Sequence, residues 1–238
     1  PWDASLPLTL ARIHCVREAF EDALHAVDEA LVIDPRLLDA HDLRAQILGD
    51  LGRHEEARAA CAPAAFGDAI PLELRGRAAF LLAEMGDAEG ATAALRALVA
   101  ERPDYAWAWL RLAGLAQAAG AHQDQLDAAE QIMRLAPSNP VGHGYAGDAH
   151  RKLDRPAEAR RALERALTLS PSYLFAGFTL IDLAIADEEP ARARKVIDAI
   201  APHTSPSSLA SHRISLALLE KDRPEANRIF AALCRDPA

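Results

Sequence analysis

The stretch ARRALERALTLSP, residues 159–171, has the pattern of an amphipathic helix that ends at a proline. A related stretch, EDALHAVDEALVIDP, occupies residues 21–35, and weaker versions precede Pro103 and Pro137. Proline cannot continue a helix, because it lacks the backbone N–H and its ring clashes with the preceding turn. A pattern that recurs in this way indicates an internal repeat.

The recurring prolines give the length of the repeat. They lie 31–36 residues apart, and the intervals centre on 34 residues. This proline column contains Pro35, Pro71, Pro103, Pro137, Pro171, Pro206 and Pro237. A second column with the same period contains the turn-forming residues Gly52, Gly86, Gly120, Asp154, Glu188 and Asp222. Glycine readily takes the left-handed conformation that ends a helix, and aspartate bonds to nearby backbone. Each repeat is therefore predicted to be two helices joined by a tight turn.

Two further columns hold mainly small residues. The first contains Ala11, Ala45, Ala79, Ala113, Gly147, Ile181 and Ser215. The second contains Ala23, Ala57, Ala91, Gln125, Ala159 and Ala193, followed by Ala226 if the last repeat lacks one residue. Small side chains let two helices approach to about 8 Å. One helix pair cannot bury its apolar face alone, whereas stacked pairs form a continuous core. The sequence therefore predicts an all-α fold without strands.

Composition excludes several classes of function. The net charge of −9 disfavours a nucleic-acid partner, which requires a basic surface. No apolar run approaches the ~18 residues of a membrane span, so we expect no membrane partner and a cytoplasmic location. Cys15, Cys61 and Cys234 lack the spacing of a zinc site. With no recognisable catalytic motif either, we expect no metal, no cofactor and no catalytic residue in this chain.

The repeat resembles a known family. A helix–turn–helix unit of 34 residues, with small residues at positions 8 and 20 and a proline at position 32, is similar to the tetratricopeptide repeat. The clearest instance is AWAWLRLAGLAQAAGAHQDQLDAAEQIMRLAP, residues 106–137. Trp109, Leu112, Ala113 and Pro137 stand there at the family's positions 4, 7, 8 and 32. The resemblance implies a single solenoid domain, residues 1–238, in which antiparallel helix pairs form a right-handed superhelix. Its expected units are 4–37, 38–71, 72–105, 106–139, 140–173, 174–207 and 208–238.

The sequence also departs from the family pattern. Tryptophan stands at position 4 only once, in the unit 106–139. Pro63 and Gly67 interrupt the second helix of the unit 38–71, which we expect to be short or broken. A similar irregular joint is expected at residues 201–208. The helical-hairpin repeat of prenyltransferase α subunits has a similar length, but the small columns fit the tetratricopeptide unit better.

The resemblance also implies a binding face. In tetratricopeptide stacks the first helix of each unit lines a concave groove. The family's inward positions, laid on this sequence, contain five aromatic residues of a chain in which aromatics make up only 5%: Phe80, Trp107, Tyr145, Phe175 and Phe178. Such residues, together with arginine, carry much of the binding energy in interfaces. The predicted partner-binding residues are Arg77, Phe80, Trp107, Arg111, Tyr145, Asp148, Arg151, Phe175, Phe178 and Asp182.

Two of these arginines, Arg77 and Arg111, lie one period apart. They are candidates for binding a peptide carboxylate or backbone carbonyls. The alternative is that they form ion pairs with Glu73, Asp148 or other neighbours. The Lys and Asn residues with which the family binds acidic chaperone tails are missing from the matching positions, so such a tail is not the expected ligand.

Three functions remain open at this point. The leading hypothesis is an interaction scaffold that holds a protein or peptide ligand in the groove. The second is a substrate-docking or regulatory arm of an enzyme, since bacterial relatives of this repeat are often fused to sulfotransferase, glycosyltransferase or hydroxylase domains. The absence of an initial Met and of a polar capping helix favours a fragment of a longer protein. The third is self-association through the uncapped ends of the stack.

Overall fold

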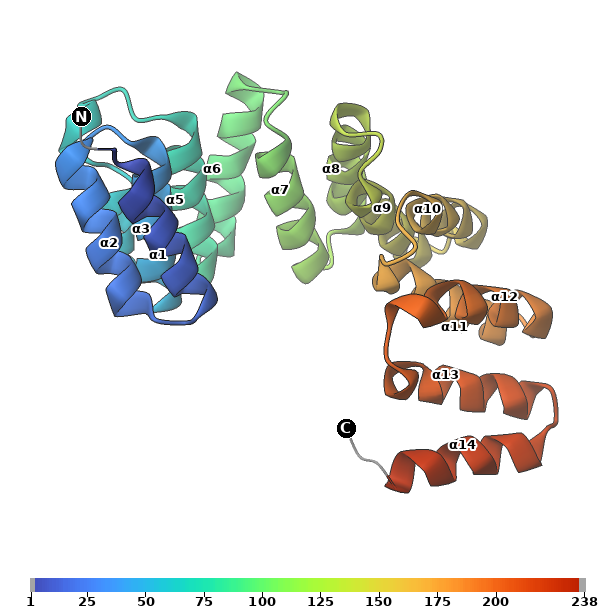
Figure 1. Cartoon of the computed structure of the whole chain (residues 1–238). Coiled ribbons are helices and arrows are strands. Elements are labelled where there is room, and N and C mark those ends of the chain that lie inside the picture. The colour runs from blue at the N-terminus through green and yellow to red at the C-terminus, as the bar shows by residue number, and fades with distance from the viewer. Residues whose placement is uncertain (1–2, 236–238) are drawn as a thin grey trace. The chain divides into compact units, whose positions relative to one another are not determined.

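The structure, a computed structural model, describes residues 3–235 (Figure 1). Within this range the chain contains fourteen α-helices, two short 3₁₀ helices and no strand. The predicted all-α fold is therefore confirmed for the described residues. Pro237, the last member of the proline column, lies outside this range.

The chain divides into two compact units, Pro1–Leu115 and Ala116–Ala238, and the boundary falls inside one helix. The first unit contains α1 (Ser5–Val16), α2 (Phe20–Ile33), α3 (Leu38–Asp50), α4 (His54–Ala60), α5 (Leu72–Glu84), α6 (Ala88–Glu101) and most of α7 (Ala106–Ala118). The second contains the end of α7, then α8 (His122–Leu135), α9 (Pro140–Lys152), α10 (Pro156–Leu169), α11 (Leu174–Ala186), α12 (Pro190–Ile200), α13 (Pro206–Leu219) and α14 (Arg223–Arg235). Within each unit, consecutive helices form antiparallel hairpins and successive hairpins stack (Figure 1).

The predicted turn column has the expected backbone conformation at five of its six positions. Positive φ angles of 56–90° occur at Gly52, Gly86, Gly120, Asp154 and Glu188. Glu18 takes the same conformation in the first repeat, with φ of 57°. In the last repeat the prediction is wrong by one residue, because Lys221 rather than Asp222 has the positive φ, 61°. The side chain of Asp222 instead accepts a hydrogen bond from the Glu225 N–H at 3.1 Å, which caps the start of α14.

The shift of one residue between the predicted and the observed positions begins before the last hairpin. Ser215, the last member of the first small column, is exposed, so its predicted place in the core is wrong. The buried residues Leu209, Ala210 and Ala217 each lie 33 residues after buried residues of α11: Ala176, Gly177 and Ala184. The missing residue therefore precedes α13, in the joint that contains the 3₁₀ helix Ala201–His203. The irregularity predicted at residues 201–208 is confirmed.

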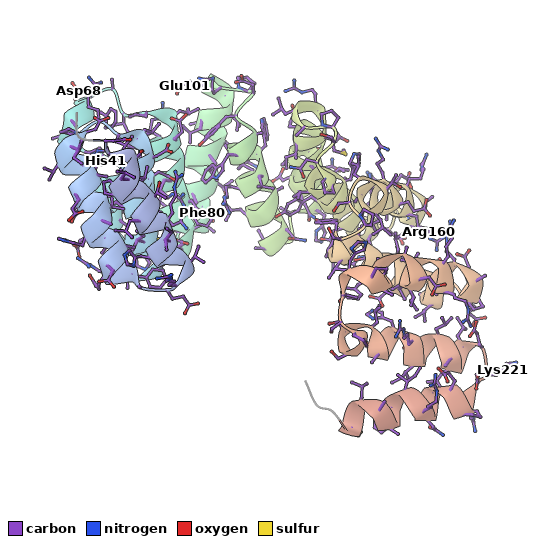
Figure 2. All side chains as sticks on the ribbon, viewed as in Figure 1. His41, Asp68, Phe80, Glu101, Arg160 and Lys221 are labelled. Atoms are coloured by element: carbon purple, nitrogen blue, oxygen red, sulfur yellow. The ribbon has the colours of Figure 1, made fainter. Side chains whose placement is uncertain are left out.

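The other predicted break is also present. α4 ends after seven residues at Ala60, and a 3₁₀ helix follows at Ala64–Phe66. Gly67 has a φ of +56°, which a residue with a side chain adopts only at a cost. The irregular segment continues through Asp68 to the start of α5 (Figure 2).

The small columns allow close helix contact. Ala11, Ala45, Ala79 and Ala113 are at most 2% exposed. At Gly147 in α9, a Cβ atom would lie 2.6 Å from Leu163 Cγ in α10. Even alanine is therefore too large at this position unless Leu163 moves.

A glycine substitution at one turn residue tests whether its positive φ is strained. Replacing Glu188 by glycine is expected to raise the free energy of unfolding by about 1 kcal/mol, because glycine takes a positive φ without steric cost. The control is Glu189→Gly at the adjacent residue, whose φ is −103°. This change is expected to give no gain, and urea denaturation followed by circular dichroism measures both. A gain of equal size in the two variants would contradict the assignment of strain to Glu188.

Candidate partner-binding face

In the first unit, a shelf of aromatic rings covers a glycine. A Cβ atom at Gly76 in α5 would lie 2.9 Å from Tyr105 Oη and 3.1 Å from Trp107 Cζ3. The rings of Tyr105 and Trp107 stack with centroids 5.8 Å apart and an interplanar angle of 22°. The absence of a side chain at Gly76 therefore lets both rings lie against α5. We call Tyr105 and Trp107 the aromatic shelf.

Phe80 and Arg111 extend this shelf. Phe80 projects from α5 (Figure 2) and meets Trp107 of α7 in an edge-to-face contact, with centroids 6.3 Å apart. The guanidinium carbon of Arg111 lies 4.5 Å from the Phe80 centroid and 4.9 Å from the Trp107 centroid. Cation–π contacts at such distances are favourable. All three side chains are half-buried, so the cluster keeps part of its surface in contact with solvent.

Arg77 is held by an aspartate from the preceding hairpin. Its Nε and Nη2 atoms donate to the two carboxylate oxygens of Asp42 in α3, both at 2.8 Å. The Arg77 side chain is only 13% exposed. Burial lowers the pKa of Arg77, but the hydrogen bonds and charge of Asp42 outweigh this effect and raise it above its ordinary value. Arg77 and Arg111, predicted to act alike, therefore have different environments.

Tyr105 stays neutral at physiological pH. Burial, and then the nearby carboxylates of Glu73 and Asp42, raise the pKa of its phenol to about 12. Trp109, at the family's position 4, donates its indole N–H to the Pro103 carbonyl at 3.0 Å and so connects α7 to the loop before it.

In the second unit, a buried carboxylate organises a polar network. Asp148 in α9 is 4% exposed. It accepts hydrogen bonds from Gln117 Nε2 at 2.8 Å, Gln125 Nε2 at 3.2 Å and Arg151 Nη2 at 2.7 Å. Burial raises the pKa of Asp148, but these three hydrogen bonds together lower it below its ordinary value. The carboxylate therefore stays ionised and fixes the position of Arg151.

Gln125 is the unusual member of this network. It stands in the second small column, where every other repeat has alanine, and it is fully buried. Its amide also donates to the Tyr145 carbonyl at 3.0 Å, which ties α8 to α9. Burying a polar group is costly unless it is hydrogen-bonded. Asp148 and Tyr145 accept from the amide nitrogen, whereas the buried amide oxygen has no hydrogen-bond partner among the described residues.

The remaining predicted residues lie around α11. Phe175 is 42% exposed and contacts Tyr173, whose ring covers Gly144 as Tyr105 covers Gly76. The Phe178 ring stacks on His212 of α13 with centroids 5.1 Å apart. His212 Nε2 also lies 3.3 Å from Asp182 Oδ1. Phe178 and Asp182 therefore meet the next hairpin through one histidine.

The structure thus places the predicted residues in separate groups, with Phe175 beside Tyr173 and only the backbone carbonyl of Tyr145 in the polar network. Three form the cluster of the first unit, Phe80, Trp107 and Arg111, whereas Arg77 is paired with Asp42. In the second unit Asp148 and Arg151 belong to the polar network, and Phe178 and Asp182 share His212. The sequence prediction missed Tyr105 and Tyr173. Both are the last residue of a unit and precede an aromatic residue by two positions, which is a detectable signal.

Among residues 3–235, no three His, Cys, Asp or Glu side chains are grouped so that they could hold a metal ion. In the same range, no helix has both the length and the apolar content that crossing a membrane demands.

Comparisons with known proteins agree with this architecture. Residues 146–173 match the family model for the tetratricopeptide repeat. A tetratricopeptide repeat protein from Parabacteroides merdae aligns with a TM-score of 0.61 and 16% identity, over 96% of this chain and 91% of its own. PilF of Pseudomonas aeruginosa aligns with a TM-score of 0.70 and 18% identity, over 83% of this chain and 90% of its own.

A third structure is YrrB, described as a tetratricopeptide repeat protein with an unusual peptide-binding site. It aligns with a TM-score of 0.50 and 17% identity, over 73% of this chain and 90% of its own. A search of curated proteins finds no significant match. At these identities the structural likenesses establish the fold. Residues 146–173 match the tetratricopeptide-repeat family, and the structural likenesses show that the chain has the all-α fold of tetratricopeptide-repeat proteins.

Proposed function

We propose that the chain is an interaction scaffold that binds a segment of a partner protein on the face formed by α3, α5 and α7 of the first unit. The observation that carries this proposal is the cluster of Phe80, Trp107 and Arg111, which joins two successive hairpins and remains partly exposed. Aromatic residues and arginine are the side chains that most often dominate binding energy in protein interfaces.

The arrangement of the cluster before any ligand binds also supports the proposal. Gly76 seats the aromatic shelf, and Arg111 lies across two rings. Side chains already held in one conformation lose little entropy when a partner binds, so more of the contact energy appears as affinity. The peptide-binding site named for YrrB, which shares this fold, is in keeping with such a use.

The second unit carries exposed and ordered groups of its own. Arg151 is held by Asp148, and Phe175 is exposed. We infer that these residues, with Tyr145, Phe178 and Asp182, form a candidate binding surface of the second unit. The docking-arm hypothesis needs a catalytic domain outside these residues, and it stays a prediction that the sequence of the complete gene would decide.

Affinity capture tests the proposed face. The immobilised chain is exposed to an extract of its source cells, and the captured proteins are compared between the original chain and Trp107→Ala. Loss of a central interface aromatic weakens binding by about 2 kcal/mol or more, which is about 30-fold in affinity. We therefore expect the partner to be lost from Trp107→Ala.

The matched control for this capture is Phe230→Ala. Phe230 is an aromatic residue on α14 that is 60% exposed and lies outside the proposed face. Phe230→Ala is expected to retain the partner. Circular dichroism verifies that both variants keep their helices. Equal capture by Trp107→Ala and the original chain would rule out the face on α3, α5 and α7.

A further inference from the structure

The charges on the proposed binding face are compensated within the chain. Arg77 makes two hydrogen bonds to Asp42, and the pair brings together one positive and one negative group. In the second unit, Asp148 does the same for Arg151. A guanidinium that already faces a carboxylate has little net charge to offer a ligand. An anionic ligand group at Arg77 would also approach the carboxylate of Asp42, and like charges repel.

The other charged groups near the aromatic shelf are of opposite sign, a guanidinium at Arg111 and a carboxylate at Glu73. Arg111 places its guanidinium against the rings of Phe80 and Trp107. Glu73 precedes Arg77 by one helical turn on α5, and its side chain is exposed. Its negative charge acts on Tyr105 of the shelf. An acidic segment lying on the shelf would meet this carboxylate.

The surface that remains available for contact is mainly aromatic. Tyr105, Trp107 and Phe80 are half-buried, and the first two stack almost parallel to each other. Aromatic surfaces of this kind bind apolar rings, either aromatic side chains or the proline rings of extended segments. A proline-containing extended segment has the added advantage that it loses little entropy on binding.

We propose, on the basis of the function proposed above, that the ligand of the α3–α5–α7 face is an extended protein segment of low net charge, which places a proline or aromatic ring against Tyr105 and Trp107. Asp42 is then a specificity residue, because it cancels the charge of Arg77 and thereby excludes acidic segments. The association depends little on ionic strength, since screening acts on net charges.

Peptide display on the full chain tests this inference. A phage library of random dodecapeptides is selected on the immobilised protein, and the enriched peptides are measured at about 0.1 M and about 1 M salt, where the Debye length is about 10 Å and about 3 Å. We expect peptides of near-zero net charge that carry proline or aromatic residues. Their affinity should change less than about threefold between the two salt concentrations and should be lost in Trp107→Ala.

A second variant tests the role of Asp42 directly. Asp42→Asn keeps the size of the side chain but leaves the charge of Arg77 without its partner. The probe is a dodecapeptide rich in glutamate, and its affinity is expected to rise about tenfold in Asp42→Asn relative to the original chain. An unchanged affinity would contradict charge compensation as the source of selectivity.

The outcomes separate the two proposals. Enrichment of acidic peptides that need Trp107 and bind much more weakly at high salt would overturn the inference about ligand class and leave the binding face intact. If no enriched peptide loses affinity in Trp107→Ala, while circular dichroism shows that this variant is folded, both the ligand class and the proposed face are wrong.

Discussion

Replacing Leu163 by alanine is expected to lower the free energy of unfolding by about 3 kcal/mol. Leu163 in α10 is fully buried and belongs to an apolar cluster with Ala166, Ala176 and Leu180. Its side chain lies directly against the backbone of α9 at Gly147, where a Cβ atom would be 2.6 Å from Leu163 Cγ. Alanine would leave a cavity at this helix crossing, and no side chain at Gly147 is available to fill it.

The effect should be local, because each repeat of a solenoid contacts only its neighbours. Hydrogen exchange is therefore expected to accelerate in α9, α10 and α11, while amides of α1–α3 remain unchanged. The control is Leu218→Ala on α13, where the side chain is 54% exposed and the expected change is below about 0.5 kcal/mol. Urea denaturation measures both variants. A uniform acceleration across the whole chain would contradict the local description.

The contact between Gly147 and Leu163 can also be tested by a substitution at Gly147. Alanine normally stabilises a helix relative to glycine by about 1 kcal/mol. Gly147→Ala is expected to destabilise the chain instead, because the new Cβ overlaps Leu163. In the Leu163→Ala background the overlap is removed, so the same substitution should become neutral or favourable. Additive effects of the two substitutions would show that these residues are not coupled.

The second large effect is expected for Asp148→Ala, which should lower the free energy of unfolding by about 2 kcal/mol. The substitution removes the acceptor that serves Gln117, Gln125 and Arg151. Gln125 is fully buried and cannot turn to water for a replacement, whereas Arg151 is partly exposed and can. For that reason the expected loss is below that of a fully buried ion pair. Urea denaturation provides the measurement.

The control for this substitution is Asp127→Ala on α8. Asp127 also accepts a hydrogen bond from a glutamine, Gln123, but both side chains are exposed. The expected loss is below about 0.5 kcal/mol. Equal losses at Asp127 and Asp148 would mean that the buried network contributes no more than an exposed hydrogen bond.

The stability from Asp148 should also depend on pH. Its pKa in the folded chain is lower than usual, since its hydrogen bonds outweigh the effect of burial. The folded state thus binds a proton at Asp148 less readily than the unfolded state, whose aspartates titrate near 3.9. The contribution is fully present above that pH and declines as the pH falls through the folded pKa. The stability difference between the original chain and Asp148→Asn should shrink over this interval.

Much of the fold was predictable because its signals are local. A proline ends a helix wherever it stands, and a column of Gly52, Gly86 and Gly120 marks turns that need a positive φ. Pro63 and Gly67 likewise indicated the shortened helix α4. The prediction was wrong at Asp222 and Ser215 because one residue is missing before α13, and counting in fixed steps cannot locate a deletion.

The binding face was only partly predictable. The family's inward positions selected Phe80, Trp107 and Arg111, which the structure brings together. They do not include Tyr105, which reaches the shelf from the loop before α7 because Gly76 leaves room for its ring. The inward positions also do not indicate that Asp148 is buried in a hydrogen-bond network. That network forms only when donors on α7 and α8 meet the carboxylate on α9.

The sequence by itself determined the repeat, the positions of most turns and the small residues at helix crossings. Each of these follows from the effect of one residue on its own backbone conformation, or on a helix that lies beside it in every repeat. Only the tertiary structure decided that Arg77 pairs with Asp42, 35 residues away, while Arg111 lies on two aromatic rings. Two arginines at the same repeat position thus differ, because the partners of a side chain are set by the residues that adjoining hairpins bring beside it.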